Sequence, residues 1–513
     1  MQVECSPICV CAHINTQKSV PPNFSHTMLG TLVLLWLGIF LFLLFITMRR
    51  PKNFPPGPTP LPLFGNLLQF NPNAPLKELD KLSQRYGSVF SIFVGGRPWV
   101  ILSGQEVIRE ALVTRAAEFT GRPDQLMVSH ILDNNGVIMS AGSKWREHRR
   151  FALTTLRNFG LGKHSMEERI LEEVKHICEH LERHAGMSMD PQNLFHNAAS
   201  NIICSIIFGS RFNYEDDYFQ TLIDRMQEFN KIVISPWAMI YDIIPPVRCL
   251  PLPFRKAFEH YEKLRAHILK VVAEHKNSWV VGKPRDMIDY YLDEMLKVTD
   301  QKKLFVHSKM VALLFDLFLA GTDTTSNTLR TLSLYLMTHE QIQERCQQEI
   351  DMVLGSREHV SYEDRHAMPY VQAVIHEAQR VSDVVPLSVF HTTTANTQIR
   401  GYSIPKGTLI VPYLSSALRE KGQWKFPDEF NPQNFLNDKG EFVKPDAFMP
   451  FSAGPRVCLG EGLARMELFL ILVTILRRFR LVWPEDGGVP DHSLIFGGTQ
   501  SVKPYCLGVQ LRL

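Results

Sequence analysis

Residues 451–460 constrain what this chain can be more than any other part of its sequence. Two glycines, Gly454 and Gly460, allow the backbone to approach a flat partner closely. Arg456 offers a planar cation that suits a carboxylate, and Cys458 offers a soft thiolate that suits iron. A haem has all of these requirements at once.

Apolar residues after this segment recur at helical spacing, at Leu463, Met466, Leu470 and Val473. A helix is therefore predicted to begin just after Cys458, where its N-terminal dipole favours a thiolate. The simpler alternative is a buried structural cysteine beside a glycine-rich turn. Five fixed residues, each with a frequency of about one in twenty, would arise by chance in the order of 2 in 10,000 such chains. The sequence therefore favours the iron-ligand interpretation.

The pattern F-x-x-G-x-R-x-C-x-G resembles the haem-binding signature of the cytochrome P450 family. The resemblance covers nearly the whole chain from Pro55 onward and implies a mainly α fold with small β-sheets. It implies that Cys458 is the axial ligand of haem b, iron-protoporphyrin IX, where a thiolate favours cleavage of the O–O bond. Residues 119–123 and 448–467 are similar to the vertebrate group that oxidises drugs, other foreign compounds and fatty acids.

Residues 308–338 are predicted to form one long helix with a weak centre, Ala320-Gly321-Thr322-Asp323-Thr324-Thr325. An interior glycine costs about 1 kcal/mol relative to alanine, and the residues after it are poor helix formers. Two helices, with Gly321 as the stop and a cap at Thr322 or Asp323, are the alternative. The motif A-G-x-D-T-T resembles the centre of the family's distal helix. It implies a local bulge, with Thr324 bonded to oxygen or water and Asp323 delivering protons.

Glu377 and Arg380 form an E-x-x-R pair, which lies on one helix face and can bond directly. Most such pairs are solvated surface pairs worth little. The resemblance implies instead a structural pair that supports the fold. The family often adds a third, basic residue in a P-E-R-F-like segment, but this chain has Asn434 there. The third partner of the pair is therefore left open.

Trp145 and Arg149 present an indole N–H and a guanidinium from one helix face. A buried tryptophan beside a surface arginine is the alternative. The family's W-x-x-x-R motif implies that both bind haem propionates, together with Arg456 and His391. Four further arginines indicate a basic face where an acidic electron donor could bind, or simply a solvated charged face. They are Arg146, Arg150, Arg477 and Arg478.

The apolar residues 232–240 include Pro236 and correspond to a mobile lid in the family, although plain core is an equal alternative. The resemblance also implies a set of apolar residues that line the substrate pocket: Phe315, Ala320, Val385, Leu387 and Phe496. An apolar or amphipathic small-molecule substrate is the resulting hypothesis.

Residues 29–48 carry no charge and could span the roughly 30 Å hydrocarbon core as a single N-terminal transmembrane helix. A cleaved signal peptide is the alternative. Arg49, Arg50 and Lys52 follow, which by the positive-inside rule leaves the later residues on the cytosolic side of the endoplasmic reticulum membrane. The predicted organisation is a head (1–28), an anchor (29–48), a proline-rich hinge (49–60) and a haem-thiolate catalytic domain (61–513).

The net charge of +3 is too slight to indicate nucleic-acid binding. Nine dispersed cysteines without paired metal-ligand spacing indicate a reducing compartment rather than a disulfide framework.

The expected activity is a monooxygenase reaction, with hydroxylation and epoxidation both open. The resemblance implies electrons from NADPH through the membrane-bound NADPH-cytochrome P450 reductase, with a b-type cytochrome as a second candidate donor. The alternatives are a haem-thiolate isomerase or dehydratase that acts on peroxides, and a non-catalytic haem-binding membrane protein. The Asp323-Thr324 pair argues against both, because neither needs a proton relay.

Overall fold

The computed structural model describes residues 24–47, 50–71, 74–160, 164–297, 306–357 and 359–512. Most of these residues are helical, and the strands form small sheets, so the predicted fold class is confirmed. The helices are α1 (Phe24–Thr47), α2 (Pro75–Tyr86), α3 (Gln105–Arg109), α4 (Met127–Ile131), α5 (Gly142–Asn158), α6 (His164–Arg183), α7 (Pro191–Ile207), α8 (Asp217–Val233), α9 (Pro236–Ile243), α10 (Arg255–Ser278), α11 (Met287–Lys297), α12 (His307–Thr338), α13 (Glu340–Leu354), α14 (Pro369–Ser382), α15 (Leu414–Leu418) and α16 (Glu461–Arg478). The strands are β1 (Val89–Val94), β2 (Arg97–Ser103), β3 (Ser188–Met189), β4 (His391–Thr392), β5 (Thr397–Ile399), β6 (Tyr402–Ile404), β7 (Leu409–Tyr413), β8 (Phe479–Val482), β9 (Leu494–Gly497), β10 (Thr499–Val502) and β11 (Leu507–Leu511).

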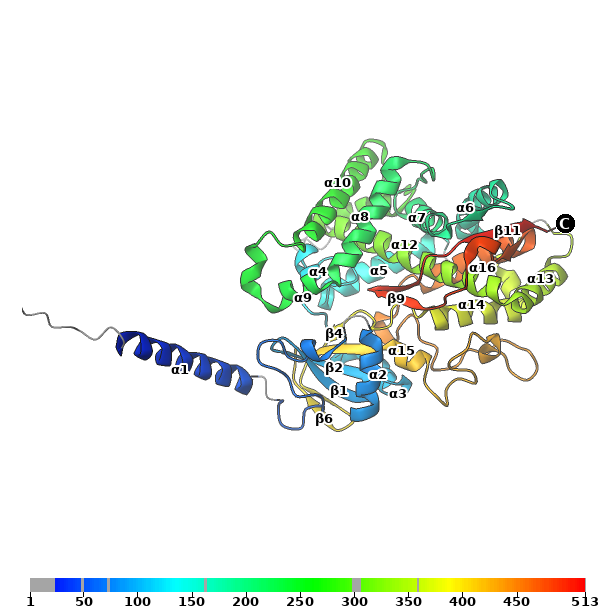
Figure 1. Ribbon diagram of the computed structural model, residues 1–513. Coiled ribbons are helices and arrows are strands. Elements are labelled where there is room, and N and C mark those ends of the chain that lie inside the picture. Colours follow the sequence, from blue (N-terminus) through cyan, green and yellow to red (C-terminus); the bar gives the residue numbers. More distant parts are fainter. Residues whose placement is uncertain are drawn as a thin grey trace, which may run out of the picture.

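The largest sheet among the described residues has the strand order β1-β2-β7-β4. Strands β1 and β2 form an antiparallel hairpin, β7 adds in parallel to β2, and β4 closes the order antiparallel to β7. The predicted strands at 89–94 and 100–102 are therefore confirmed. Figure 1 shows this sheet below the body of helices, and its side chains form a core separate from the large helical one.

Helix α12 runs through the helical body and packs against α7, α10, α14 and α16 (Figure 1). It is unbroken over 32 residues, roughly 48 Å at 1.5 Å per residue. The single-helix prediction is confirmed, and the two-helix alternative and the local bulge are both wrong. Gly321 is explained by packing, because a Cβ atom there would lie 3.1 Å from the side chain of Ile203 on α7.

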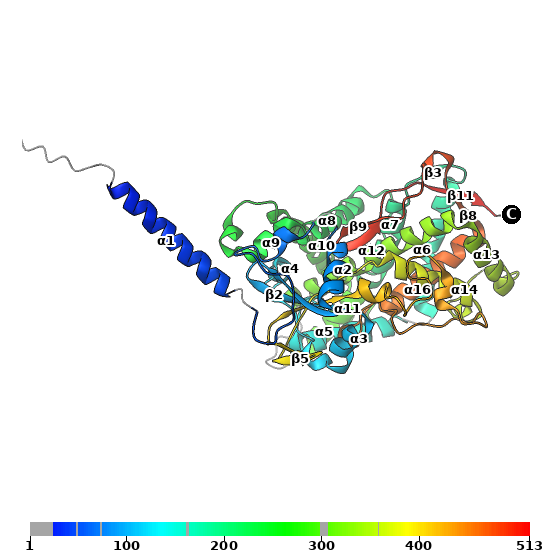
Figure 2. The same ribbon diagram turned by 60° about the horizontal axis from the view of Figure 1, so that its bottom comes forward.

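At the N-terminal end of the described residues, α1 stands away from the rest of the protein (Figures 1 and 2). Across the described part of the chain, no helix meets the length and hydropathy needed to cross a membrane. Residues 1–23 of the predicted head, and Met48 of the predicted anchor, lie outside the described residues.

The predicted hinge begins outside the described residues and then lies against β1. The Arg50 Nε atom donates to Ser91 Oγ at 2.9 Å, and the Ser91 amide donates to Pro56 O at 2.7 Å. Phe54 is buried. The close approach at Gly57 leaves no space for a side chain, because a Cβ atom would meet Ser91 O. Residues 50–58 are thus packed on the sheet, and the domain boundary near residue 60 stays a prediction.

Candidate active site

Cys458 lies between a 3₁₀ turn (Gly454–Arg456) and the first residue of α16, which confirms the helix predicted after it. Its side chain is exposed, yet protein surrounds it so closely that burial raises the pKa of its thiol. We infer that it lines an internal hollow rather than the outer surface. Backbone N–H groups of Gly460 and Glu461 bond the sulfur and act in the opposite direction, lowering that pKa.

The two glycines of this segment have different roles. Gly454 has φ +71°, and a Cβ atom there would collide with Leu112 O, so the protein backbone itself requires glycine. A Cβ atom added at Gly460 would have Cys458 Sγ as its nearest neighbour, at 4.0 Å. Gly460 therefore leaves the space beside the sulfur open, in agreement with the prediction made for both glycines, whereas Gly454 is explained by Leu112 O instead.

Arg456, Arg149 and Arg122 form a cluster of cations beside this segment. Arg456 donates to the carbonyl oxygens of Thr120 and Ser140, and its Nη1 atom has no partner among the described residues. The other two guanidinium groups also donate only to backbone carbonyls, those of Val457 for Arg149 and of Ile138, Val389 and Phe390 for Arg122. Within the described ranges, no carboxylate forms an ion pair with any of the three.

The cluster is electrostatically incomplete. Burial and the charges of Arg122 and Arg149 lower the pKa of Arg456 to about 8. Burial and Arg149 lower the pKa of Arg122 to about 9. A buried charge without a counterion is costly, so the cluster fits a ligand that brings negative charges. The two propionates of a haem supply them, and the accessible sulfur of Cys458 supplies a ligand for its iron.

Arg122 was missed by the sequence analysis as a member of this cluster, although it lies within the stretch 119–123 that carried the family resemblance. No motif at fixed spacing links it to Arg456, and only the fold brings the two together. The cation of one acts on the pKa of the other.

Trp145 and Arg149 share α5, as predicted. The guanidinium carbon of Arg456 lies 3.8 Å from the centroid of the Trp145 ring, and that of Arg149 lies 5.9 Å away. His391 lies on β4 and donates from Nδ1 to Phe119 O at 2.6 Å. Burial and the nearby Arg122 and Arg456 lower its pKa well below the usual value, so it is neutral beside the cluster.

Glu377 and Arg380 are both almost fully buried on α14 and form a bidentate pair, with N–O distances of 2.7 and 2.8 Å. Arg380 also donates to four backbone carbonyls, at Leu418, Phe426, Pro427 and Glu429. The pair therefore joins α14 to the segment between α15 and residue 429. This geometry is that of a structural pair rather than a solvated one.

Asn434 occupies the position of the third partner. Its Nδ2 atom donates to Glu377 Oε1 at 3.1 Å and to Phe426 O at 3.0 Å, and its Oδ1 atom accepts from the Phe426 amide at 2.8 Å. The question left open by the sequence is thus answered. A neutral amide completes the pair without adding a second buried cation.

Asp323 and Thr324 are neighbours on α12 but point in different directions. The Thr324 hydroxyl donates to Ala320 O at 2.8 Å. Ala320 is exposed, although most residues of α12 are buried. The Asp323 side chain is buried and turns toward α7 and α8, where Asn230 Nδ2 donates to its Oδ2 at 2.6 Å. The two groups therefore do not present a common face.

The distal and proximal segments are linked directly. Thr325 Oγ1 on α12 donates to Glu467 Oε2 on α16 at 2.9 Å. Burial raises the pKa of Glu467 to about 8. The hydrogen bond places the turn that holds Thr324 beside the helix that begins after Cys458.

The five predicted pocket residues differ in exposure. Ala320 is exposed, and three others, Val385, Leu387 and Phe496, are partly accessible. Phe315 is fully buried and packs edge-on against Phe229 and Tyr261, at centroid distances of 5.3 and 5.0 Å. The lining roles stay predictions, and Phe315 lies within the aromatic core.

The predicted basic face divides into two parts. Arg477 pairs with Asp351 at 2.7 Å, a carboxylate that it shares with Arg512, and Arg478 pairs with Glu182, so both cations have local acidic partners. On α5, Arg150 pairs with Glu147, whereas Arg146 and Arg157 form no ion pair with a described residue. A recess of about 280 Å³ lies beside Trp145 among these arginines.

The predicted lid, residues 232–240, spans the end of α8 and the start of α9. Its side chains Ile234, Trp237 and Met239 are exposed at 37–38%. Such exposure is unlike a plain core segment, and a lid role stays a prediction.

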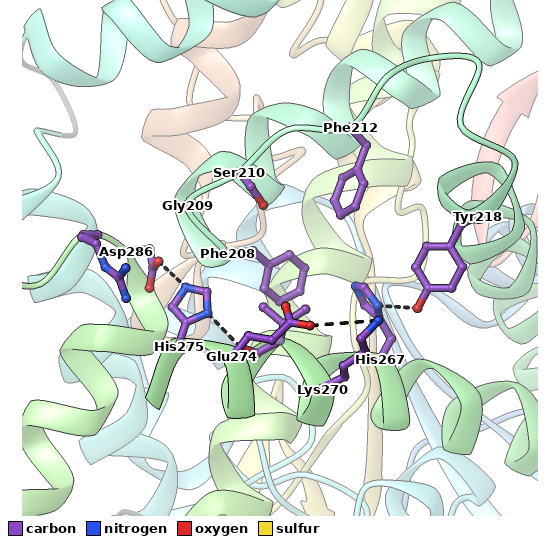
Figure 3. Close-up of a pocket in the computed structure, with 12 residues that line it drawn as sticks. Phe208, Gly209, Ser210, Phe212, Tyr218, His267, Lys270, Glu274, His275 and Asp286 are labelled. Carbon is purple, nitrogen blue, oxygen red and sulfur yellow. Dashed lines mark hydrogen bonds and ion pairs between the residues drawn. The ribbon is translucent and has the colours of Figure 1, made fainter. Parts of the chain in front are cut away.

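A larger recess, about 390 Å³, is lined by the loop between α7 and α8, by α8 and α10, and by the loop before α11, and contains none of the predicted haem residues (Figure 3). His275, Asp286 and Asp289 beside it are close enough to share a metal ion. However, His275 pairs with Asp286 at 2.6 Å, and Asp289 receives two bonds from the Arg285 guanidinium. Their charges are already compensated, so we interpret the cluster as an ion-pair network.

Comparisons with known proteins show the family to which the chain is similar. The family model described as Cytochrome P450 matches residues 55–505. The chain is 42% identical to Cytochrome P450 2J2 of Homo sapiens over 88% of this chain and 91% of the relative. It is 43% identical to Cytochrome P450 2F2 of Mus musculus, over 90% and 94%, and 43% identical to Cytochrome P450 2C8 of Homo sapiens, over 92% and 97%.

Proposed function

This chain belongs to the cytochrome P450 family and is a haem-dependent monooxygenase, and we propose that it oxidises apolar or amphipathic small molecules at the hollow beside Cys458. The bound haem b supplies the chemistry that activates O₂, so that one oxygen atom enters the substrate and the other leaves as water. The observation that carries the proposal is the cation cluster without a counterion beside an accessible thiol.

The residues that would hold the haem follow from the site. Cys458 provides the sulfur ligand, and backbone N–H groups favour its thiolate form. Arg456, Arg149 and Arg122 would bind the propionates, and Trp145 holds the Arg456 guanidinium in place by stacking.

On the distal side, the Thr324 hydroxyl orients the oxygen or a water, and Asp323 supplies protons. Thr324 lies on the accessible stretch of α12, which supports a direct contact. Asp323 is buried away from it, so proton supply requires movement of this carboxylate or relay through Thr324.

The substrate class follows from the predicted lining residues, which are apolar. Fatty acids, drugs and other foreign compounds have suitable chemistry, and hydroxylation and epoxidation are both compatible with it. Entry past the exposed apolar side chains of the lid fits such substrates.

The proposed electron source is NADPH, through NADPH-cytochrome P450 reductase, with a b-type cytochrome as a second donor. Arg146 and Arg157 support docking at α5, because neither is neutralised by a described acid and both lie beside the haem-binding Trp145. An acidic donor would be steered to this face by its charge.

The proposed location is the endoplasmic reticulum membrane, with the catalytic domain on the cytosolic side. Its support is the uncharged sequence 29–48, the exposed apolar side chains along residues 28–42, and the projection of α1 from the protein (Figures 1 and 2). Retention of the full chain in the microsomal fraction after a carbonate wash, and release of a variant lacking residues 1–48, is the expected result.

Reconstitution tests the reaction directly. With the reductase, NADPH, O₂ and a panel of fatty acids and drug-like compounds, we expect a product that contains one atom from labelled O₂. Cys458→Ser should abolish both turnover and the red-shifted Soret band of the reduced carbon monoxide complex. Turnover of an organic peroxide without reductase would identify an isomerase or dehydratase instead, and haem binding without any turnover would identify a non-catalytic protein.

A further inference from the structure

His196 on α7 faces the carboxylate of Asp323 inside the protein. Its Nε2 atom lies 3.4 Å from Asp323 Oδ1, and the two side chains are 6% and 9% exposed. That oxygen has no hydrogen-bond partner among the described residues. The other carboxylate oxygen accepts from Asn230 on α8. Asp323 is therefore held between two helices, away from the Thr324 hydroxyl that follows it in the chain.

The contact between His196 and Asp323 requires a proton between the two side chains. The Nδ1 atom of His196 lies 2.9 Å from Gln192 O and 2.7 Å from Ser326 Oγ. A carbonyl oxygen only accepts and a hydroxyl can donate or accept, so Nδ1 either donates to Gln192 O or accepts from Ser326 Oγ. An Nε2 lone pair directed at Asp323 Oδ1 would be repulsive if the carboxylate is ionised. The contact is therefore favourable only if a proton lies on Nε2 or on Oδ1.

Arg330 is a charged group near the pair, because Asp323 acts on its pKa. It follows on the same helix and is buried, and its Nε atom has no partner in the described part of the chain. Asn230 and Ser326, the remaining contacts of the pair, do not titrate near neutral pH. The proton between His196 and Asp323 is thus enclosed, and half-buried Asn230 marks the side nearest to solvent.

We propose that His196 is a positioning residue that shares one proton with Asp323 and so supplies the distal side of the site. Movement of the Asp323 carboxylate away from Asn230 carries the proton to the Thr324 hydroxyl, which gives its own proton to the distal side. Only O–H and N–H bonds form and break, and the pair regains one proton from solvent in each cycle. This inference rests on the proposed roles of Asp323 and Thr324.

The test variant is His196→Gln. A glutamine amide can donate to Asp323 Oδ1 and hold it in place, but it cannot lend a proton. We expect the carbon monoxide spectrum of the reduced protein to be unchanged. Product formed per NADPH should fall roughly tenfold, with the difference appearing as hydrogen peroxide. His184→Gln, in the turn after α6, where the ring bonds to His180 O, is the matched control and should couple normally.

A spectroscopic readout independent of turnover is the ¹⁵N-histidine spectrum of the carbon monoxide complex. His196 is assigned by the signals lost in His196→Gln. We expect a protonated or hydrogen-bonded Nε2. A free, unprotonated Nε2 would overturn the shared proton.

Two further variants separate this inference from the proposed function. If Thr324→Ala and Asp323→Asn both couple normally, the distal roles themselves are wrong. If these two uncouple but His196→Gln couples like the unchanged protein, only the role of His196 is wrong. If His196→Gln fails to bind haem, the ¹⁵N-histidine spectrum of Asp323→Asn tests the role of His196 instead. His196 should then have a neutral ring whose Nε2 accepts from the Asn amide.

Discussion

The guanidinium of Arg456 stacks on the indole of Trp145 at 3.8 Å from the ring centroid. Arg456 comes from the turn before Cys458, and Trp145 comes from α5, more than 300 positions earlier. The stacking leaves one guanidinium nitrogen, Nη1, without an acceptor in the described part of the protein. The contact thus fixes a cation in place while keeping a hydrogen-bond donor for a bound anion.

Arg122→Gln should weaken haem binding by about tenfold, because a charge-assisted hydrogen bond contributes roughly 1.5–3 kcal/mol. The haem-free protein should lose little stability, because the lost bonds from Arg122 to backbone carbonyls are offset by the removal of one of three mutually repelling cations. Haem transfer to apomyoglobin and thermal unfolding of both forms measure the two effects. Arg157→Gln, at the exposed end of α5, is the control and should change neither.

Thr324→Ala should leave haem binding and the carbon monoxide spectrum intact. Its hydroxyl bonds only to Ala320 O among the described residues, so the fold loses little. NADPH consumption should continue with a larger share of electrons released as hydrogen peroxide. Tight coupling of NADPH to product in this variant would contradict the distal role of the hydroxyl.

Asn434→Ala should lower the free energy of unfolding by about 1–3 kcal/mol, because it removes the bond to Glu377 and leaves the Phe426 amide without its acceptor. Glu377→Ala should cost more, about 3–5 kcal/mol, since it leaves the cation of Arg380 buried without its carboxylate. Denaturant unfolding of the holo-protein measures both. Gln433→Ala is the control, as no hydrogen bond of that side chain is found among the described residues, and a loss of equal size there would contradict the assignment.

Asp316 gives a prediction for pH. Burial raises its pKa to about 7, although the amides of Val137 and Ile138 donate to Oδ2 at 2.7 and 2.9 Å and act against the rise. The folded protein therefore binds a proton at Asp316 that the unfolded chain has released, and this contribution to stability is lost as the pH rises from about 4 through about 7.

Asp316→Asn removes this dependence. We expect its unfolding temperature to rise relative to that of the unchanged protein as the pH increases across this range. The quantity to measure is the difference in unfolding temperature between the two proteins. Burial also raises the pKa values of Asp383 and Glu467, but their contributions cancel in this difference. A difference independent of pH would contradict the raised pKa.

Charge reversal on α5 tests the electron-donor face. Arg146→Glu and Arg157→Glu should slow reduction by the reductase, more strongly at low ionic strength, because both charges are exposed and steer encounter. Haem binding should be unaffected. Lys263→Glu on α10, another exposed position without an ion pair to a described residue, should have no effect on the rate. Equal slowing by all three variants would indicate a general charge effect instead of a docking face.

Local patterns in the sequence were enough to predict the features that depend on residues close together in the chain. The helix after Cys458, the shared face of Trp145 and Arg149, and the pair of Glu377 and Arg380 each depend on residues within a few positions of one another. Helical geometry fixes such neighbours before any tertiary contact forms.

Only the tertiary structure decided the contacts between segments remote in the chain. Ile203 on α7 explains Gly321, Asn434 completes the pair at Glu377, and Arg122 joins the haem-binding cations. The direction of Asp323 belongs to the same class, since residues on α7 and α8 turn it away from Thr324. Periodicity gives the face of a helix on which a residue lies, but the partner on that face is set by how the whole chain packs.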